Sequence, residues 1–417
     1  MACSPATDRT TAAGPPGSAS PTSEAPPVDG GALTVGITLE ATGFDPTIDR
    51  WGGPTILEGS AILEPLATLD AEGRAQPWLL TRWTPNADFT SWTLDLRPGV
   101  TFHDGTPFDA DAVKMNLDDL LSAPLTGVGL TVMFKEVVVV DADTVRVDLH
   151  KPWAAFPSSF LAGPNSWMKA PRTIGPDGNA GTHPIGTGPF VFSSWTRDTK
   201  LELARNPTYW RPGEPHLDKL TFVPIPDDSS RANALRTADV DMMLTMSARD
   251  ANDLDGTYEV VRDWDTVTTL LALNTRETAG KRPNPLHNIH ARKALSYATD
   301  PQAIAAFAGE GLVVPTSPFA DGTPWGDPVA AQSYASFDRE RAKAELDAYK
   351  RETGADHLEV DLLGPAGTDT QTILQAVSQQ WSEVGIVTTI EALDFGPYSL
   401  RGVTGDFNAV LLSLIHI

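Results

Sequence analysis

The chain has 417 residues, 41% of them hydrophobic, and can bury large cores without metals or disulfides. Its net charge of −23 argues against nucleic-acid binding, because phosphate contacts require clustered Lys and Arg, and favours a soluble monomer. The single cysteine excludes an internal disulfide or a multi-cysteine zinc site, and no apolar run approaches the roughly 20 residues of a membrane-spanning helix.

Residues 1–32 are expected to form a disordered tether. The stretch from Pro5 to Gly31 is rich in Ala, Pro, Ser, Thr and Gly, and such a composition buries too little apolar surface to fold. A small residue before Cys3, followed by a flexible tether, resembles the mature end of a bacterial lipoprotein. Cys3 is therefore the predicted lipid-attachment residue, and a chance cysteine is the alternative.

The first half of the ordered chain is predicted to be rich in strands. A β-rich run covers residues 33–39, and apolar residues alternate from Trp92 to Leu96. Acidic residues from Asp109 mark the start of a helix with Val113 and Leu117 on one face. Residues 137–149 are typical of a β-hairpin that turns at residues 141–143.

The second half is predicted to be α/β. Helices are expected at residues 289–298, 301–308 with Asp300 as N-cap, and 338–353, ending at Gly354. A β-α-β unit follows, with strands at 358–363 and 386–390 and a helix at 370–384. Its apolar residues share one face, so this helix should pack on a sheet.

Six separated segments resemble the family 5 solute-binding proteins, which include oligopeptide, dipeptide and nickel receptors. The resemblance covers residues from 33 to about 412, and its segments keep the family's order. They are Leu96 to Val113 with its Phe-His-Asp-Gly turn, Pro184 to Phe190, Arg205 to Trp210, Leu217 to Asp227, Leu271 to Thr275 and Arg292 to Ala298.

The resemblance implies an α/β, two-lobed periplasmic-binding-protein-like fold of the class II type, with mixed sheets and an extra N-terminal subdomain. The expected N-terminal lobe spans residues 33–268, with an inserted subdomain at about 58–190, and the C-terminal lobe spans residues 269–417. It also implies a non-enzymatic, extracytoplasmic receptor that passes a peptide or similar small solute to the permease subunits of an ABC importer. No cofactor or metal is expected.

The resemblance also suggests which segments face the ligand. One segment is the loop from Thr47 to Pro54, which contains Arg50 and Trp51. The other segments contain Asn165, Trp167, Trp264, Thr266, Phe395 and Tyr398, with one hinge at residues 264–268. Aromatic side chains bury area at little entropic cost, and Arg50 would pair with a carboxylate. Packing in the core or on the surface is the alternative role for each residue.

Three positions test the resemblance further. Gly186 and Gly188 are expected to allow positive φ in a tight loop that leads to the strand at residues 190–192. Ala238 stands where the family usually has glycine, and a turn of another type is expected there. After Leu412 the family pattern does not resume, so a truncated C-terminal lobe is expected.

Other functions have weaker support in the sequence. His287 and His290 would place two imidazoles on one helical turn for a metal, but no third ligand is nearby. His103 and Asp104 are better explained as a turn than as an acid–base pair. The alternatives that stay open are a secreted hydrolase, for which no nucleophile was located, a nickel-chelate, opine or sugar receptor, and a surface receptor or chaperone without a transporter.

Overall fold

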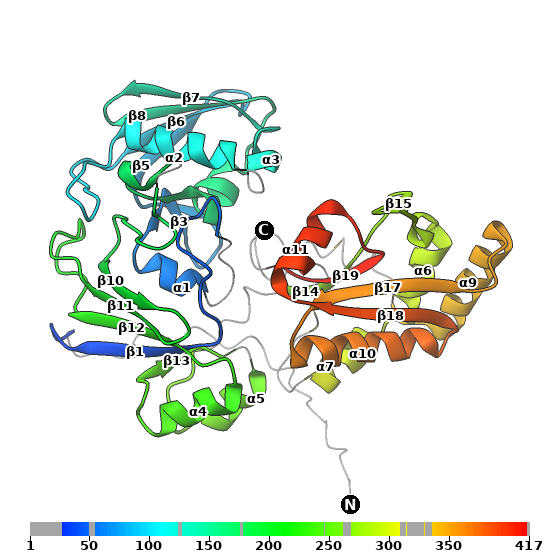
Figure 1. The fold of residues 1–417 in the computed structure, drawn as a ribbon. Coiled ribbons are helices and arrows are strands. Elements are labelled where there is room, and N and C mark those ends of the chain that lie inside the picture. Colours follow the sequence, from blue (N-terminus) through cyan, green and yellow to red (C-terminus); the bar gives the residue numbers. More distant parts are fainter. Residues whose placement is uncertain are drawn as a thin grey trace, which may run out of the picture.

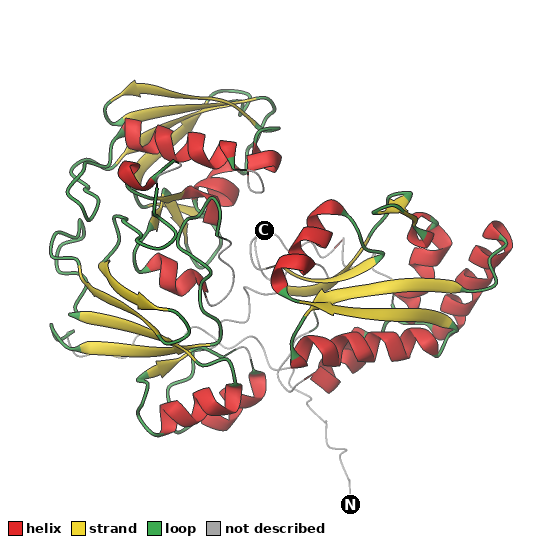
Figure 2. Ribbon diagram, in the orientation of Figure 1, coloured by secondary structure: helices red, strands yellow, loops and turns green. Residues whose placement is uncertain are grey.

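The computed structural model describes residues 27–49, 55–123, 127–175, 178–245, 247–261, 268–308, 314, 329 and 336–414. These residues form two bodies, one ending at residue 261 and the other starting at residue 268 (Figure 1). The buried hydrophobic clusters divide in the same way, because each contains residues of one body alone. Both bodies combine helices and strands (Figure 2), which confirms the predicted α/β class.

A five-stranded mixed sheet forms the base of the first body. Its order is β10-β11-β12-β1-β13; β1 is parallel to β12 and β13, whereas β11 is antiparallel to both neighbours. The strands are β1 (Ala32–Ile37), β10 (Phe190–Thr196), β11 (Lys200–Arg205), β12 (Lys219–Pro224) and β13 (Met242–Met243). The nearby helices are α1 (Thr55–Ser60), α4 (Asp228–Arg236) and α5 (Ala248–Leu254).

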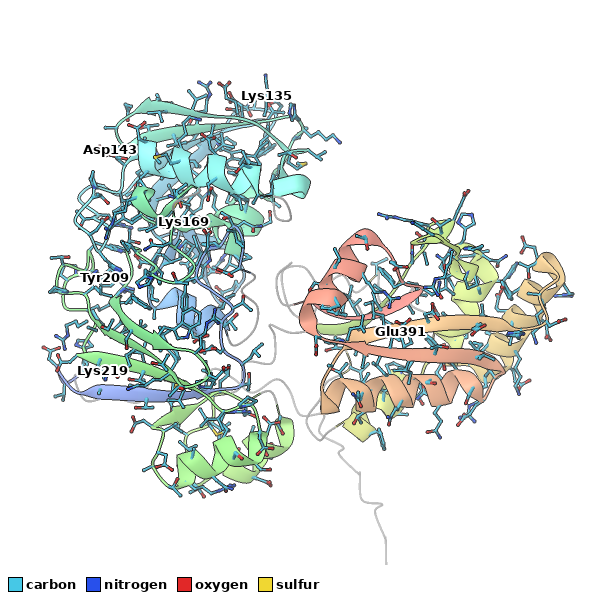
Figure 3. All side chains as sticks on the ribbon, viewed as in Figure 1. Lys135, Asp143, Lys169, Tyr209, Lys219 and Glu391 are labelled. Atoms are coloured by element: carbon cyan, nitrogen blue, oxygen red, sulfur yellow. The ribbon has the colours of Figure 1, made fainter. Side chains whose placement is uncertain are left out.

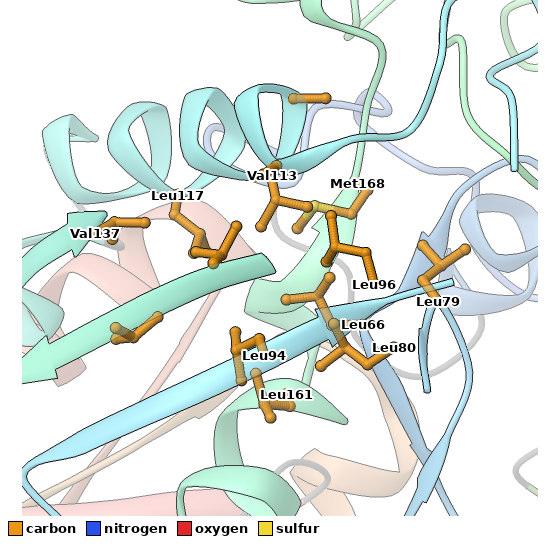
Figure 4. Close-up of a cluster of buried hydrophobic side chains, with 14 of the residues drawn as sticks. Leu66, Leu79, Leu80, Leu94, Leu96, Val113, Leu117, Val137, Leu161 and Met168 are labelled. Carbon is orange, nitrogen blue, oxygen red and sulfur yellow. The ribbon is translucent and has the colours of Figure 1, made fainter. Parts of the chain in front are cut away.

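The other layer of the first body is an antiparallel sheet covered by a helix. Strands β5 (Leu80–Pro85), β6 (Ser91–Leu96), β8 (Thr144–Leu149) and β7 (Phe134–Asp141) are hydrogen-bonded in this order. Helix α2 (Ala110–Ser122) begins after Asp109, whose carboxylate caps it, and α3 (Gly127–Leu130) follows. Figure 4 shows Val113 and Leu117 of α2 in the core with Leu94 of β6. The predicted strand, helix and hairpin of this region are confirmed.

Short elements connect the two sheets of the first body. Strand β2 (Glu64–Pro65) pairs with β9 (Trp167–Met168), and β3 (Ala67–Leu69) pairs with β4 (Ala75–Pro77). A π-helical turn covers Pro157–Leu161, and 3-10 turns cover Pro164–Ser166 and Pro171–Thr173.

The second body is built on a four-stranded sheet with the strand order β14-β19-β17-β18. Its strands are β14 (Thr268–Leu273), β17 (Leu358–Pro365), β18 (Ile386–Leu393) and β19 (Ala409–Leu414), and a small ribbon pairs β15 (Thr278–Ala279) with β16 (Arg282–Pro283). A 3-10 turn (Pro285–His287) leads to α6 (Ile289–Ala298), α7 (Pro301–Ala308) and α9 (Arg339–Thr353); α10 (Thr368–Ser382) and α11 (Phe395–Thr404) complete the body.

The predicted β-α-β unit is confirmed. Strands β17 and β18 pair in parallel, and α10 joins them, packing with the fully buried Trp381 against their face. The indole N–H of Trp381 donates to the hydroxyl of Thr299 at 2.9 Å, so this large side chain leaves no polar atom without a partner. The predicted N-cap Asp300 accepts a backbone N–H at the start of α7, and Gly354 ends α9 with φ of 73°, as predicted. Asp338, predicted as the first residue of that helix, is its N-cap and accepts the backbone N–H of Arg341.

Two predictions about turns are wrong. Neither Gly186 nor Gly188 has a positive φ; a Cβ at these residues would instead lie 2.0 Å and 2.6 Å from the carbonyl oxygen of Ile62. Close backbone contact therefore requires these glycines. Ala238, which follows α4, has φ of 59°, so it adopts the left-handed conformation that glycine favours rather than a different turn.

Candidate functional site

Lys169, whose place in the first body is labelled in Figure 3, is the centre of a buried polar cluster. Its ammonium lies 2.5 Å from a carboxylate oxygen of Asp45 and 2.7 Å from one of Asp119, on α2. The side-chain amide of Asn116, one helical turn before Asp119, accepts the backbone N–H of Lys169 at 3.0 Å and donates to its carbonyl at 2.9 Å. These contacts tie together the chain before residue 49, α2 and the end of β9.

Two predicted ligand-facing residues lie beside this cluster. Asn165 is in the 3-10 turn before β9, and Trp167 is the first residue of β9. Both side chains are half-buried. Thr47, whose hydroxyl donates to Asp45 at 2.7 Å, begins the other predicted ligand-facing segment of this body. Lys169 therefore brings the segments that contain Thr47 and Trp167 to one place.

The predicted residues of the second body lie near one edge of its sheet. Phe395 starts α11 two residues after β18 ends, and β18 is paired up to Leu393 with the end of β17 at Pro365. Thr268, the first residue of β14, pairs with Leu414 at the end of β19. The carboxyl ends of the parallel strands and the entry of the chain into this body thus share an edge. Figure 1 shows α11 at the end of this body that faces the first body.

Tyr398 is part of the packing of the second body. It is 9% exposed, contacts the small cluster of Leu363 and Val410, and donates its hydroxyl to the carbonyl of Leu411 at 2.7 Å. Burial raises the pKa of its phenol. This geometry favours the core-packing role for Tyr398, which anchors α11 to the sheet. Ligand contact by Asn165, Trp167, Phe395 and Tyr398 stays a prediction.

Other predicted residues lie outside the part of the chain that the structure describes. Arg50 and Trp51 fall between the last described residue before α1 and the start of that helix. Trp264 and Thr266 fall between residues 261 and 268, at the crossing between the two bodies. Cys3 precedes residue 27. Their roles also stay predictions.

Sequence reasoning missed Glu64, a buried carboxylate that joins the family motifs. It accepts hydrogen bonds from the indole N–H groups of Trp78 (3.0 Å) and Trp210 (2.8 Å), and from the hydroxyls of Thr187 and Tyr209 (both 2.7 Å). Burial nevertheless raises the pKa of Glu64. Thr187 comes from the motif at 184–190, and Tyr209 and Trp210 come from the motif at 205–210. The motifs therefore converge on one acceptor as a scaffold.

His103, in the first family motif, has a similar structural role. Its Nε2 lies 2.9 Å from the carbonyl of Gly188, and its Nδ1 accepts the backbone N–H of Gly186 at 3.4 Å, so the neutral imidazole bridges this loop. Burial lowers the pKa of His103, which favours the neutral form. Asp104 accepts from Thr106 within the turn, and Arg172 lies 2.7 Å from its other oxygen. The pair is a turn, as predicted.

A cavity of about 380 Å³ lies beside this turn, within the first body. Its lining includes His103, Asp104, Arg172, His183 and Phe192. Most of its polar groups already have partners: Asp104 pairs with Arg172, and His183 accepts from or donates to its neighbour Thr182 at 3.0 Å. The cavity is thus a feature of the scaffold at residues 184–192.

Metal ligation finds little support in the described part of the chain. There, His, Cys, Asp and Glu side chains nowhere gather in threes with the geometry of a metal site. Of the predicted histidine pair, His287 contacts the carbonyl of Thr275 at 3.1 Å, whereas the Nδ1 of His290 lies 2.5 Å from a carboxylate oxygen of Glu345. The helices of the described residues include none that is both long and apolar enough to span a membrane.

Relatives with known names share the sequence and the architecture. The chain is 30% identical over 335 residues to the glutathione-binding protein GsiB of Salmonella paratyphi A, a match that covers 79% of this chain and 63% of that protein. GsiB of Escherichia coli O6:K15:H31 is 29% identical over the same length. The chain thus spans less than two thirds of the length of these relatives.

Solved structures have the same two-lobed fold. The binding protein AgaA of A.tumefacien R10, in complex with agropinic acid, has a TM-score of 0.79 and 26% identity over 92% of this chain and 77% of its own. DppA from Helicobacter pylori, in complex with the peptide STSA, has a TM-score of 0.75 and 23% identity over 93% of this chain and 78% of its own. These proteins are periplasmic binding proteins, as their names state, and the predicted fold class is confirmed.

The family follows from the extent of the match. Residues 74–415 match the family described as bacterial extracellular solute-binding proteins, family 5 Middle. This range includes all six of the sequence segments that resemble the family. The named relatives are binding proteins rather than enzymes. The chain belongs to family 5 of the bacterial extracellular solute-binding proteins.

Proposed function

We propose that the protein captures a small peptide-like solute between its two bodies, outside the cytoplasm, and delivers it to the permease of an ABC importer. The observation that carries this proposal is the placement of the predicted contact segments. In the first body, Thr47 and the strand that begins at Trp167 lie near Lys169, and Phe395 lies at the sheet edge where the chain enters the second body. In open α/β sheets, ligands bind outside the carboxyl ends of the strands.

The named relatives support the proposed class of solute. GsiB binds glutathione, a tripeptide, and DppA was solved with a peptide, whereas AgaA holds agropinic acid. A peptide-like solute offers backbone amides along its length and a carboxylate at its C-terminal end, and Arg50 would pair with that carboxylate. Trp167 would cover an apolar part of the solute at little entropic cost.

The mechanism is a shift between open and closed arrangements of the two bodies. A solute that touches both bodies binds the closed arrangement better and increases its population in proportion to that difference in affinity. The hinge at residues 264–268 connects the bodies. The protein acts as a monomer, without a chemical step, and lipidation of Cys3 would hold it at the outer face of the membrane.

Direct binding tests the proposal. Native mass spectrometry of the protein purified without refolding should show a co-purifying solute. Calorimetric titration with glutathione, the peptide STSA, agropinic acid and nickel–histidine should give a micromolar or tighter dissociation constant for at least one of them. Absence of binding to all four, with no co-purifying solute, would contradict the proposal, and so would hydrolysis of a bound compound.

Trp167 offers a sharper test of where the solute binds. Trp167→Ala should weaken binding of the bound compound at least tenfold, because it removes a half-buried aromatic surface beside the Lys169 cluster. Trp83→Ala is the matched control, since Trp83 is a half-buried tryptophan on β5 that packs on the core of the other sheet. Equal dissociation constants for both variants would place the solute elsewhere.

A further inference from the structure

Lys169 is a fully buried cation whose partners come from two distant parts of the chain. Its side chain is 2% exposed, and its ammonium forms ion pairs with Asp45 and Asp119, which are 21% or less exposed. Taking an ammonium and two carboxylates out of water costs several kcal/mol per ion, and their attraction roughly offsets this cost. Apolar side chains would fill the same space without that cost, so the cluster calls for an explanation other than stability.

The contacts of Asp45 suggest what the cluster does. The carboxylate oxygen that Lys169 contacts also accepts the backbone N–H of Thr47 at 3.0 Å and its hydroxyl at 2.7 Å. The backbone carbonyl of Asp45 accepts the N–H groups of Ile48 and Asp49, at 3.1 Å and 2.7 Å, and its N–H donates to the Asp49 carboxylate at 3.0 Å. Asp45 therefore organises a tight turn over residues 45–49, and Lys169 holds Asp45.

The neighbours of Asp49 show that the turn is tightly packed. A Cβ at Gly43 would lie 2.1 Å from the carboxylate of Asp49, so the chain passes directly against it. On the other side, the backbone N–H of Phe44 donates to the carbonyl of Gly181 at 3.0 Å. The turn is thus fixed on its flanks by backbone contacts and at its centre by Lys169.

We infer that Lys169 is a positioning residue for solute binding, which sets the 45–49 turn and the start of β9 relative to each other without touching the solute. This inference rests on the proposed function, because the two segments that Lys169 joins contain Thr47 and Trp167. A rigid placement of both segments before the solute arrives lowers the entropic cost of binding. Asn116 completes the arrangement by holding the backbone of Lys169 on both sides.

Variants can separate positioning from stability. Asp119→Asn removes one carboxylate of the cluster but leaves the contact between Lys169 and Asp45, so it serves as the matched control. Lys169→Met removes the cation and leaves two carboxylates facing each other. The double variant Lys169→Met with Asp119→Asn keeps the cluster at the parent's net charge of −1, and should fold even if the single variant does not.

Hydrogen exchange measures the turn directly and needs no solute. Both Lys169→Met variants should exchange the amides of residues 45–49 at least tenfold faster than the parent, with β10–β12 unchanged as an internal reference. Asp119→Asn should keep the parent's protection in the turn. If the turn is equally protected in the double variant and in Asp119→Asn, Lys169 does not position it and the inference is wrong.

The affinity for the solute is the second readout. It is measured with whichever of glutathione, the peptide STSA, agropinic acid or nickel–histidine the parent binds. The temperature is kept well below the thermal unfolding midpoint of each variant. The double variant should bind at least tenfold more weakly, and Asp119→Asn within twofold of the parent. Equal affinities would contradict the inference while the proposed function stands. If the parent binds none of the four, the proposed function fails, and hydrogen exchange alone decides whether Lys169 orders the turn.

Discussion

Glu58 is a buried acid whose protonation is linked to folding. Its carboxyl accepts the backbone N–H of Ala41 at 2.8 Å, and burial raises its pKa from 4.5 to about 8. Between these values the folded protein binds a proton that the unfolded chain releases. Raising the pH through this window therefore lowers the free energy of unfolding, by up to about 1.4 kcal/mol per pH unit from this group.

Glu58→Gln should remove this pH dependence. The amide oxygen can still accept from Ala41, and it does not titrate, so the variant should match the parent near pH 4.5 and be more stable than it at pH 8. Urea unfolding at a series of pH values measures the difference. Glu136→Gln, at an exposed position of β7, is the control and should keep the parent's slope. Parallel curves for the parent and Glu58→Gln would contradict the assignment.

Ala238 has the backbone conformation that favours glycine. Its φ of 59° follows the end of α4, where a left-handed residue commonly terminates a helix. Ala238→Gly should raise the free energy of unfolding by about 0.5–1 kcal/mol, because relief of the left-handed strain exceeds the added entropy of the unfolded chain. Ala234→Gly, inside α4, should lower it by about 1 kcal/mol. Denaturation that shows a loss of stability for both would contradict this explanation.

Among the elements, the loop at residues 184–190 shows which features a local sequence pattern predicts and which depend on long-range contacts. The sequence correctly predicts a tight loop that leads to β10, since two glycines stand between Pro184 and Pro189. It assigns the wrong reason to the glycines, because the partner that excludes a side chain is the carbonyl of Ile62, more than 120 residues earlier. Contacts of that separation leave no periodic signal in the sequence.

Gly186→Ala should therefore be severely destabilising. Its Cβ would lie 2.0 Å from the carbonyl oxygen of Ile62 and 2.6 Å from the side chain of Leu63, so the backbone must shift, at a cost of about 2–4 kcal/mol. Gly129→Ala is the matched control, because nothing lies within 4 Å of a Cβ there. Thermal unfolding midpoints should fall strongly for the first variant alone. A midpoint near the parent's for Gly186→Ala would show that the loop adapts.

The lack of a sequence signal for long-range contacts also explains which residues of the candidate site could not be predicted. Periodicity and caps predict the elements of both bodies well, as α6 and the β-α-β unit show. Lys169 and Glu64 escape prediction, since a lone Lys or Glu in or beside a two-residue strand gives no sign in the sequence that it is buried. The indole and hydroxyl donors in the motifs are a partial signal, because buried Trp and Tyr require an acceptor. The acceptor itself becomes evident only in three dimensions.

In the whole molecule, the proposed capture of a solute depends on two bodies with separate cores. Each core consists of residues from one side of the crossing at 262–267. Separate cores allow each body to move as a rigid unit, so that closure needs changes at a few hinge positions alone. The solute gains contacts from both bodies in the closed arrangement and provides the energy for the change.

Small-angle X-ray scattering of the protein with and without a bound solute tests this claim most directly. The radius of gyration should decrease when glutathione, or another compound shown by calorimetry to bind, reaches saturation. An equal concentration of a compound that does not bind is the control and should leave the profile unchanged. Scattering profiles that coincide with and without a saturating, bound solute would contradict capture between the two bodies.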